Sequence, residues 1–398
     1  MPQSPSRGEF IALLALLFAT IALSIDAMLP ALPEIALALS PDDPNKAQLV
    51  ITSFVLGMGL GTLFAGPLSD AFGRKATILA GFALYIAAAA ACWAAPSLET
   101  LLIARVLMGI AAAAPRTVSI AMVRDRFKGR EMAQIMSFAM MIFTLVPAIA
   151  PLMGQGVIAL AGWQAIFVAY IVFALLVAGW LQLRQPETLA PADRRPLALG
   201  PLVRACVEVL SLRLVQISIA TQALTLGMLF ATLSSMEGIF DRLFHRAESF
   251  PSWFAVIAVA SMTGSILNAR LVMRVGMRGM VKATYAVLLA VTLLYLALTA
   301  SQALPGTAAF GLHILWSIVL FAVMGLTLGN LNALAMEPLG HVAGMAASVT
   351  SSIATVASVI LAVPVGLMFN GTQLPLLIGV AVYAAGALGL SLMLKARA

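Results

Sequence analysis

Three charged residues lie inside long apolar stretches of the sequence, where a charge is costly and therefore marks a candidate functional group. Asp26 stands between Ile25 and Ala27 in the first of these stretches. A carboxylic acid in such surroundings can take up and release a proton. Apolar neighbours and a nearby arginine change its affinity for that proton in opposite directions. The alternative is that the helix ends at Pro30 and leaves Asp26 near a polar boundary.

Two arginines, Arg105 and Arg116, lie within the fourth apolar stretch. They are eleven residues apart, about three turns of an α-helix, and therefore share a face with the small residues Gly109 and Ala112. We expect this stripe to face a water-filled cavity, because a charge facing lipid is expensive. The alternatives are a purely structural ion pair for Arg105 and, for Arg116, a side chain that extends to the membrane surface.

The composition excludes a water-soluble protein. Hydrophobic residues make up 62% and charged residues 10% of the 398 residues, and the mean hydropathy is +1.03. Because the apolar stretches are continuous rather than alternating, they predict membrane-spanning helices and not a β-barrel. The net charge of +7 is explained by basic loops rather than by a nucleic-acid partner, and Cys92 and Cys206 are too few for a disulfide framework or a metal site.

The apolar stretches predict twelve helices in two groups of six. The longest polar break runs from Arg184 to Arg213 and divides the chain into a first bundle (1–184), a cytoplasmic linker (185–208) and a second bundle (209–398). The expected helices begin near Phe10, Ala47, Ala76, Leu98, Glu131, Trp163, Leu212, Ser252, Val281, Thr307, Gly344 and Leu374.

The segment Gly66–Lys75 is expected to be a short, charged, turn-rich loop between the second and third helices. Lys and Arg are concentrated in this loop, at both termini and in the other loops on the same side, which indicates that this side and both termini are cytoplasmic. Phe72–Lys75 has a counterpart in Val275–Arg278, where Met273 stands in place of Asp70. Two like-built halves are typical of transporters.

The fifth helix contains Pro147, Pro151, Gly154 and Gly156, a pattern that predicts a bend at a helix contact, although simple tolerance of Pro and Gly is the alternative. The polar candidates for a cavity in the second half are Gln222, Thr225, Asn330 and Asn332, and the alternative for each is an interhelical hydrogen bond. His313 is expected to be a packing residue rather than a proton relay. No nucleotide-binding loop, zinc spacing or nucleophile setting is present, so neither an enzyme nor a metal site is expected.

Together these motifs resemble the major facilitator superfamily and, within it, the drug:proton antiporters of the bicyclomycin and chloramphenicol/florfenicol resistance branch. The resemblance rests on the loop Gly66–Lys75, on Arg105–Gly109, on Pro147–Gly156 and on Ser24–Pro33, and it covers nearly the whole chain. One departure is Met108, where the family often has Gln.

The resemblance implies an all-α membrane protein with twelve transmembrane helices in two pseudo-symmetric six-helix bundles, which move around a central cavity by alternating access. It assigns proton coupling to Arg105 and Asp26. It also assigns a conformational latch to Gly66, Asp70, Gly73, Arg74 and Lys75, and an antiporter motif to the Pro and Gly residues of the fifth helix. Arg116 departs from the familiar pattern and makes a neutral substrate more suitable than a strongly cationic one.

The expected function is therefore proton-driven export of small amphipathic drugs such as phenicols by a protein of the bacterial inner membrane. No cofactor is expected, the helices are expected to be surrounded by lipid, and a monomer is expected to be sufficient for transport. The cavity is expected to include Asp26, Arg105, Gly109, Ala112, Arg116, Gln222, Thr225, Asn330 and Asn332. An alternative with the same fold is a carrier of a physiological metabolite such as a sugar, peptide or amino acid. A membrane enzyme or a sensor would need a catalytic constellation or an added soluble domain, and the sequence has neither.

Overall fold

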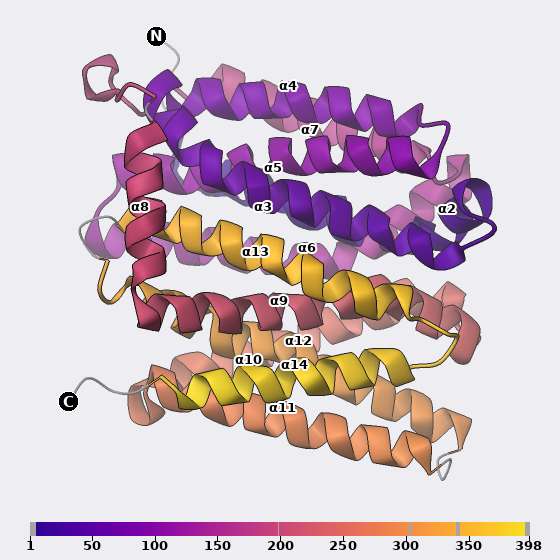
Figure 1. Cartoon of the computed structure of the whole chain (residues 1–398). Helices are drawn as coiled ribbons and strands as arrows, with labels where there is room; N and C mark the ends of the chain where they lie inside the picture. Colours follow the sequence, from indigo (N-terminus) through magenta and orange to yellow (C-terminus); the bar gives the residue numbers. More distant parts are fainter. Residues whose placement is uncertain (1–4, 198, 302–304, 340–342, 395–398) are drawn as a thin grey trace. The chain divides into compact units, whose positions relative to one another are not determined.

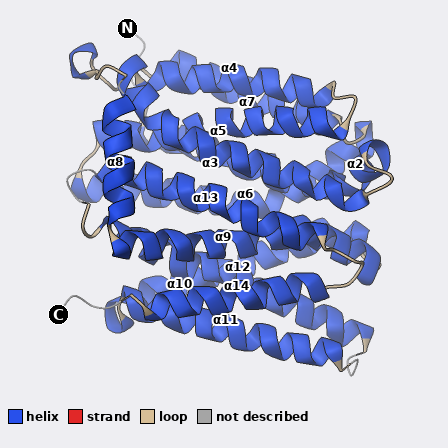
Figure 2. Cartoon of the chain, viewed as in Figure 1, coloured by secondary structure: helices blue, strands red, loops and turns tan. Residues whose placement is uncertain are grey.

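The computed structural model describes residues 5–197, 199–301, 305–339 and 343–394, and every regular element in these ranges is helical (Figures 1 and 2). Within them, 12 helical segments are long and apolar enough to cross a membrane. This confirms the expected all-α membrane fold.

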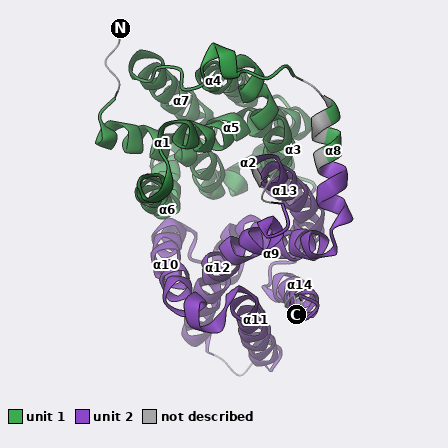
Figure 3. Cartoon of the chain, turned by 90° about the vertical axis from the view of Figure 1, so that its left-hand side faces the viewer, with its two compact units in different colours: residues 1–42, 53–204 green, residues 43–52, 205–398 purple. Residues whose placement is uncertain are grey.

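The chain forms two compact units, which Figure 3 shows in different colours. The first comprises Met1–Asp42 and Ser53–Arg204, and the second comprises Asp43–Thr52 and Ala205–Ala398. Residues 43–52 thus group with helices that lie far away in the sequence. The side-chain amide of Asn45 accounts for part of this grouping, since it donates to the carbonyl oxygens of Leu367 (3.1 Å) and Phe369 (2.6 Å).

The first unit is built from long helices that begin and end at recognisable signals. The hydroxyl of Ser6 caps the first helix by accepting from Glu9 N. Ser97 and Thr100 form a reciprocal capping box at the start of the helix that begins at Leu98. The helices are α1 (Arg7–Asp26), α2 (Leu32–Leu39), α3 (Leu49–Phe72), α4 (Arg74–Trp93), α5 (Leu98–Arg126), α6 (Gly129–Ala161) and α7 (Ala165–Arg184), with a 3₁₀ turn at Leu29–Ala31.

Close packing in the first unit depends on glycine. α4 packs against α5 and α7, and α1 packs against α5 and α6. Where α3 and α5 cross, a Cβ on Gly57 would meet the backbone of Val106, and one on Gly109 would meet the carbonyl oxygen of Phe54. Small residues allow such close approach of helix backbones in a membrane, where association depends on packing rather than on exclusion of water.

The second unit repeats this plan. α9 packs against α12, α13 and α14, and α10 crosses α12 at Gly264, where a Cβ would meet the backbone of Ala322. The elements are η2 (Pro44–Gln48), α9 (Arg213–Gly238), a π-helical turn (Ile239–Leu243), α10 (Phe250–Val275), α11 (Met277–Ala300), α12 (Gly306–Met336), α13 (Ala343–Leu367) and α14 (Leu374–Leu392).

One expectation about the loops is wrong. The segment Gly66–Lys75 is not a turn-rich loop, because α3 continues as a helix through Pro67 to Phe72 and only Gly73 interrupts the path into α4. Gly73 adopts φ 100°, a conformation that glycine tolerates because it has no Cβ. The predicted linker contains a 3₁₀ turn at Pro191–Asp193 and the first part of the helix α8 (Leu199–Ser211).

Candidate functional site

Asp26 is the last residue of α1 and is buried, with 6% of its surface exposed. The apolar span does not end there, because it continues through the 3₁₀ turn and α2 to Leu39. Within the described residues, the Asp26 carboxylate takes part in no ion pair or hydrogen bond. A buried acid without a counter-ion is rare unless it has a function.

Arg105 of α5 is fully buried and lies beside the same part of α1. One guanidinium nitrogen, Nη2, donates to the carbonyl oxygen of Ser24 at 3.0 Å, and Nη1 lies 3.6 Å from the sulfur of Met108. The guanidinium carbon stands 4.5 Å from the centre of the Phe54 ring. The cation is therefore held by a backbone carbonyl, a thioether and an aromatic face, all of which suit a weakly hydrated arginine.

Ser24 joins these groups into one cluster. Its carbonyl oxygen accepts from Arg105 and also from the hydroxyl of Tyr170 on α7, at 3.3 Å. Its own hydroxyl lies 2.5 Å from the Tyr85 hydroxyl on α4. The helices α1, α4, α5 and α7 are thus in contact at Ser24, which lies two residues before Asp26. The residues Ser24, Tyr85 and Tyr170 were not among the sequence-based candidates.

The stripe predicted on α5 is not uniform. Arg105, Gly109 and Ala112 are buried, and Gly109 lies against the backbone of α3 rather than beside open space. Arg116 differs from these three because it is exposed. Gly109 and Ala112 thus pack within the first unit in this structure, and their place in a transport cavity stays a prediction.

The Pro and Gly residues of the fifth predicted span lie within α6, and both Pro147 and Pro151 are inside the helix. The two glycines differ in their surroundings. A Cβ on Gly154 would meet the carbonyl oxygen of Ala27, the residue after Asp26, whereas a Cβ on Gly156 would meet nothing within 4 Å. Gly154 is thus the residue that brings α6 next to the end of α1.

The polar candidates of the second unit fall into three environments. Thr225 and Asn330 are buried and hydrogen-bonded, to the hydroxyl of Tyr285 and to the Oδ1 of Asn268, respectively. Gln222 is buried, and its Nε2 has no hydrogen-bond acceptor in the described part of the chain. Asn332 is exposed. The interhelical hydrogen bonds considered for this group therefore exist at two of the four positions.

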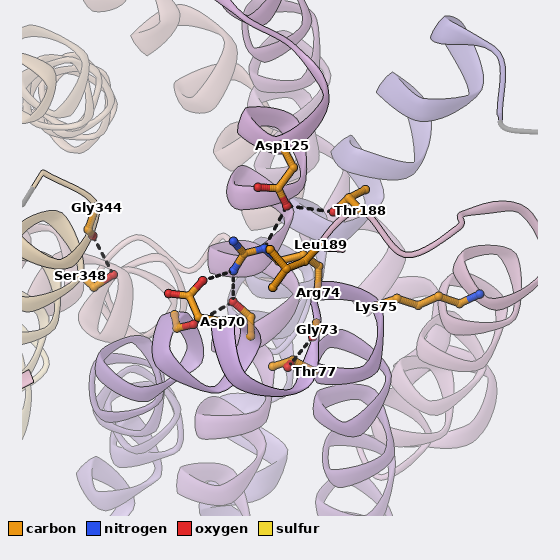
Figure 4. Close-up of polar contacts among 12 residues, drawn as sticks. Asp70, Gly73, Arg74, Lys75, Thr77, Asp125, Thr188, Leu189, Gly344 and Ser348 are labelled. Carbon is orange, nitrogen blue, oxygen red and sulfur yellow. Dashed lines mark hydrogen bonds and ion pairs between the residues drawn. The ribbon is translucent and has the colours of Figure 1, made fainter. Parts of the chain in front are cut away.

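Arg74 is the centre of a charged cluster where α3 meets α4 (Figure 4). Its guanidinium group forms ion pairs with Asp70 and with Asp125 of α5, the latter at 3.0 Å, and it donates to the hydroxyl of Ser69 at 2.7 Å. Asp70 remains 44% exposed, whereas the Arg74 side chain is 10% exposed. The predicted Asp70 and Arg74 are therefore in direct contact within the first unit.

The remaining latch residues serve the backbone around this cluster. The carbonyl of Gly66 accepts from the Ser69 hydroxyl at 2.8 Å, and Lys75 Nζ donates to the carbonyl of Gln182 at 2.8 Å. Gly73 packs against Glu187, whose Oε2 a Cβ at this position would meet. These contacts tie the turn to α7 and to the chain that follows it.

Comparison with known proteins settles the family. Residues 14–362 match the family model that is described as "Major Facilitator Superfamily". The chain belongs to this superfamily. It is a multi-pass membrane transporter, and neither the superfamily nor the fold is that of an enzyme.

The relatives of this superfamily member agree with the predicted branch. An uncharacterised MFS-type transporter, YdgK of Bacillus subtilis, is 29% identical over 87% of this chain and 86% of its own length. A bicyclomycin resistance protein homolog of Haemophilus influenzae is 30% identical over 72% of each chain. The multidrug resistance protein MdtL of Escherichia coli is 31% identical over 42% of this chain and 43% of its own.

Solved structures share the fold of this major facilitator protein. A D-xylose-proton symporter superposes with a TM-score of 0.76 at 13% identity and covers 97% of each chain. The human organic anion transporter MFSD10 gives a TM-score of 0.64 at 17% identity and covers 98% of this chain and all of its own. At such identities the likeness concerns the fold alone.

Two acids of this transporter were not among the predicted site residues. The Glu187 carboxylate accepts from four backbone N–H groups, those of Arg74 (2.9 Å), Lys75 (3.1 Å), Thr188 (2.9 Å) and Leu189 (3.1 Å). An acid in a polar linker carries no signal of such a role. Glu237 in α9 is 6% exposed, and the rule that selected Asp26, a charge within an apolar stretch, also applies to it.

Proposed function

We propose that this transporter exports small amphipathic drugs such as phenicols in exchange for protons, by alternating access. The observation that carries the proposal is the Asp26 carboxyl group, which is buried, without a counter-ion in the described part of the chain, and next to the cluster around Ser24. A group of this kind can hold a proton in one state of the protein and release it in another.

The proposed cycle uses Asp26 as the proton carrier and Arg105 as the residue that fixes its surroundings. Substrate binds while Asp26 is unprotonated, and the protein then opens outward. Asp26 takes up a proton, the substrate leaves, and the protonated protein returns. Because Arg105 donates to the backbone carbonyl of Ser24 and not to Asp26, the Asp26 carboxylate is available to bind a proton or to contact the substrate.

The choice of drugs as substrates rests on the relatives and on charge. Two of the relatives bear names that refer to bicyclomycin or multidrug resistance. The first unit contains Arg105 and the exposed Arg116 in α5, against one buried acid in α1. An excess of positive charge disfavours a strongly cationic substrate, so a neutral amphipathic compound is the proposed cargo.

The ion pairs of Arg74 with Asp70 and Asp125 are the proposed conformational latch. The proposed setting is the bacterial inner membrane with both termini and this latch on the cytoplasmic side, since basic residues are concentrated in those loops. A monomer contains both halves and is the proposed working unit.

The proposal is tested by measuring chloramphenicol efflux and the accompanying proton movement in inverted membrane vesicles. Asp26→Asn keeps the size of the side chain and removes the titratable group, so it should abolish drug-driven proton movement, whereas Asp26→Glu should retain part of it. Collapse of the proton gradient should stop efflux by the unaltered protein. Efflux that survives both Asp26→Asn and the uncoupler would show that coupling through Asp26 is wrong.

A substrate panel tests the cargo separately. Cells that express the transporter should tolerate phenicols better than cells with the empty vector, and the same cells should show no altered uptake or release of sugars, peptides and amino acids. If only a metabolite responds, the protein remains a major facilitator transporter but its cargo is the physiological compound.

A further inference from the structure

A pocket of about 590 Å³ lies at one end of the second unit, where four helix ends meet. α9 and α11 begin there, and α12 and α14 end there. The pocket therefore lies at the level where membrane-spanning helices enter the headgroup region of the bilayer. Its lining includes the apolar Leu214, Ile217 and Leu392 and the charged Arg213, Arg278 and Glu337.

The lining divides into an apolar part and a basic part. Leu214 and Ile217 of α9 face the pocket together with Leu392, which is 61% exposed. The charged residues are Arg213 and Arg278 against the single acid Glu337. A site that combines an apolar wall with excess positive charge is complementary to a molecule with an anionic head and a hydrocarbon chain.

Arg278 has unused hydrogen-bonding capacity in this pocket. Its Nη2 donates to the Oε2 of Glu337 at 2.9 Å, but its Nε is buried and has no acceptor among the described residues. A guanidinium group that lacks an acceptor on one side is costly, and it presents the forked geometry that binds phosphate oxygens.

The corresponding place in the first unit supplies its own anions. There the charged cluster around Arg74 contains Asp70 and Asp125, and Glu187 accepts from the backbone at the start of α4. In the second unit, Glu337 is the one acid among the described residues that line the pocket with Arg213 and Arg278. The first unit thus neutralises its loop with carboxylates of the chain, whereas the second leaves a positive excess beside an apolar wall.

We propose that this pocket binds an anionic phospholipid, with the phosphodiester group between Arg213 and Arg278 and an acyl chain along Leu214, Ile217 and Leu392. Such a lipid would connect the ends of α9, α11 and α14 and would bind independently of any drug or proton. The proposal concerns a site distinct from the cluster around Asp26 and does not depend on the transported compound.

The test is native mass spectrometry of the purified full-length protein with added phosphatidylglycerol, phosphatidylcholine or inorganic phosphate. The unaltered protein should prefer phosphatidylglycerol to phosphatidylcholine. Arg213→Gln and Arg278→Gln should each weaken phosphatidylglycerol binding about fivefold and reduce that preference. Arg274→Gln is the matched control, because Arg274 is an exposed arginine near the end of α10 that does not line the pocket.

A variant with the opposite expected sign separates binding from misfolding. Glu337→Gln breaks the same ion pair as Arg278→Gln, but it removes a negative charge and should therefore strengthen phosphatidylglycerol binding. Equal weakening by Glu337→Gln and Arg278→Gln would overturn the proposal, as would an unchanged lipid preference in the Arg213→Gln/Arg278→Gln double variant. Displacement of the lipid by an equal concentration of inorganic phosphate would also overturn it, because the occupant would then be a free anion.

Discussion

Arg105 donates a hydrogen bond of 3.0 Å to the carbonyl oxygen of Ser24, two residues before the buried Asp26. A backbone carbonyl does not change its charge when a proton arrives or leaves. The acceptor of this hydrogen bond is therefore the same in either protonation state of the acid. This separates the residue that sets the geometry of the cluster from the residue proposed to carry the proton.

Replacement of this arginine by lysine tests the role of its geometry. In Arg105→Lys the charge remains, but a single ammonium group does not provide both the hydrogen bond to Ser24 and the planar contact with the Phe54 ring. We expect efflux to fall about tenfold, since a hydrogen bond from a charged group contributes about 1.5–3 kcal/mol. Arg130→Lys, at an exposed position in α6, is the control. Normal efflux by Arg105→Lys would show that charge alone suffices.

The two glycines of α6 provide a matched pair. Gly154→Ala would place a methyl group on the carbonyl oxygen of Ala27, so the start of the turn after Asp26 must move. We expect a loss of about 1–3 kcal/mol in unfolding free energy from this overpacking, together with reduced efflux. Gly156→Ala meets no neighbour within 4 Å and should leave both unchanged. Thermal unfolding in detergent and drug susceptibility measure the two effects, and equal behaviour of both variants would contradict the assigned contact.

Asp70 is the more exposed partner in its ion pair with Arg74 and provides a test of the proposed latch. Asp70→Asn retains the shape of the side chain but removes the charge that pairs with Arg74. We expect transport to be impaired while membrane insertion and abundance stay normal, because Asp125 and Ser69 still hold Arg74 in place. Asp193→Asn makes the same substitution at an exposed residue outside the cluster and should be neutral. A fully active Asp70→Asn protein would show that Asp70 has no role in transport and belongs only to the end of α3.

The internal repeat allows a comparison between halves. The Ser24–Tyr85 hydroxyl pair has a counterpart in Thr225 and Tyr285, but the residue two positions after Thr225 is Gly227 rather than an acid. Tyr85→Phe removes the buried hydrogen bond to Ser24, and Tyr285→Phe removes the one to Thr225, each worth about 1 kcal/mol of stability. Only Tyr85→Phe should also lower drug-driven proton movement in vesicles. A transport defect of the same size in Tyr285→Phe would mean that the pair acts through stability alone.

The number and type of helices followed from the sequence because each span needs a continuous apolar stretch, and a stretch of that length is stable in few settings besides a lipid bilayer. Asp26 and Arg105 were predicted for the same reason, since a charge within an apolar stretch stands out. Their immediate partners were not. Ser24, Tyr85 and Tyr170 are ordinary residues of membrane helices, and only the packing of α1 against its neighbours brings them together.

The contacts of charged residues in polar surroundings also could not be predicted from the sequence. Glu187 lies in a linker rich in proline and charge, so nothing in its neighbourhood marks it as the acceptor of four backbone N–H groups. The helical course of Gly66–Phe72 was missed because Gly and Pro usually end helices, whereas a membrane helix tolerates both. Only the glycine with positive φ, Gly73, ends it.

The grouping of residues 43–52 with the second unit has a consequence for synthesis. Asn45 and Leu367, its hydrogen-bond partner, are separated by 322 residues. Ribosomes add about 5–20 residues per second, so Asn45 waits on the order of tens of seconds before that carbonyl exists. The first half of the chain can enter the membrane as soon as it is made, but Asn45 acquires these hydrogen bonds only after Leu367 and Phe369 have been added.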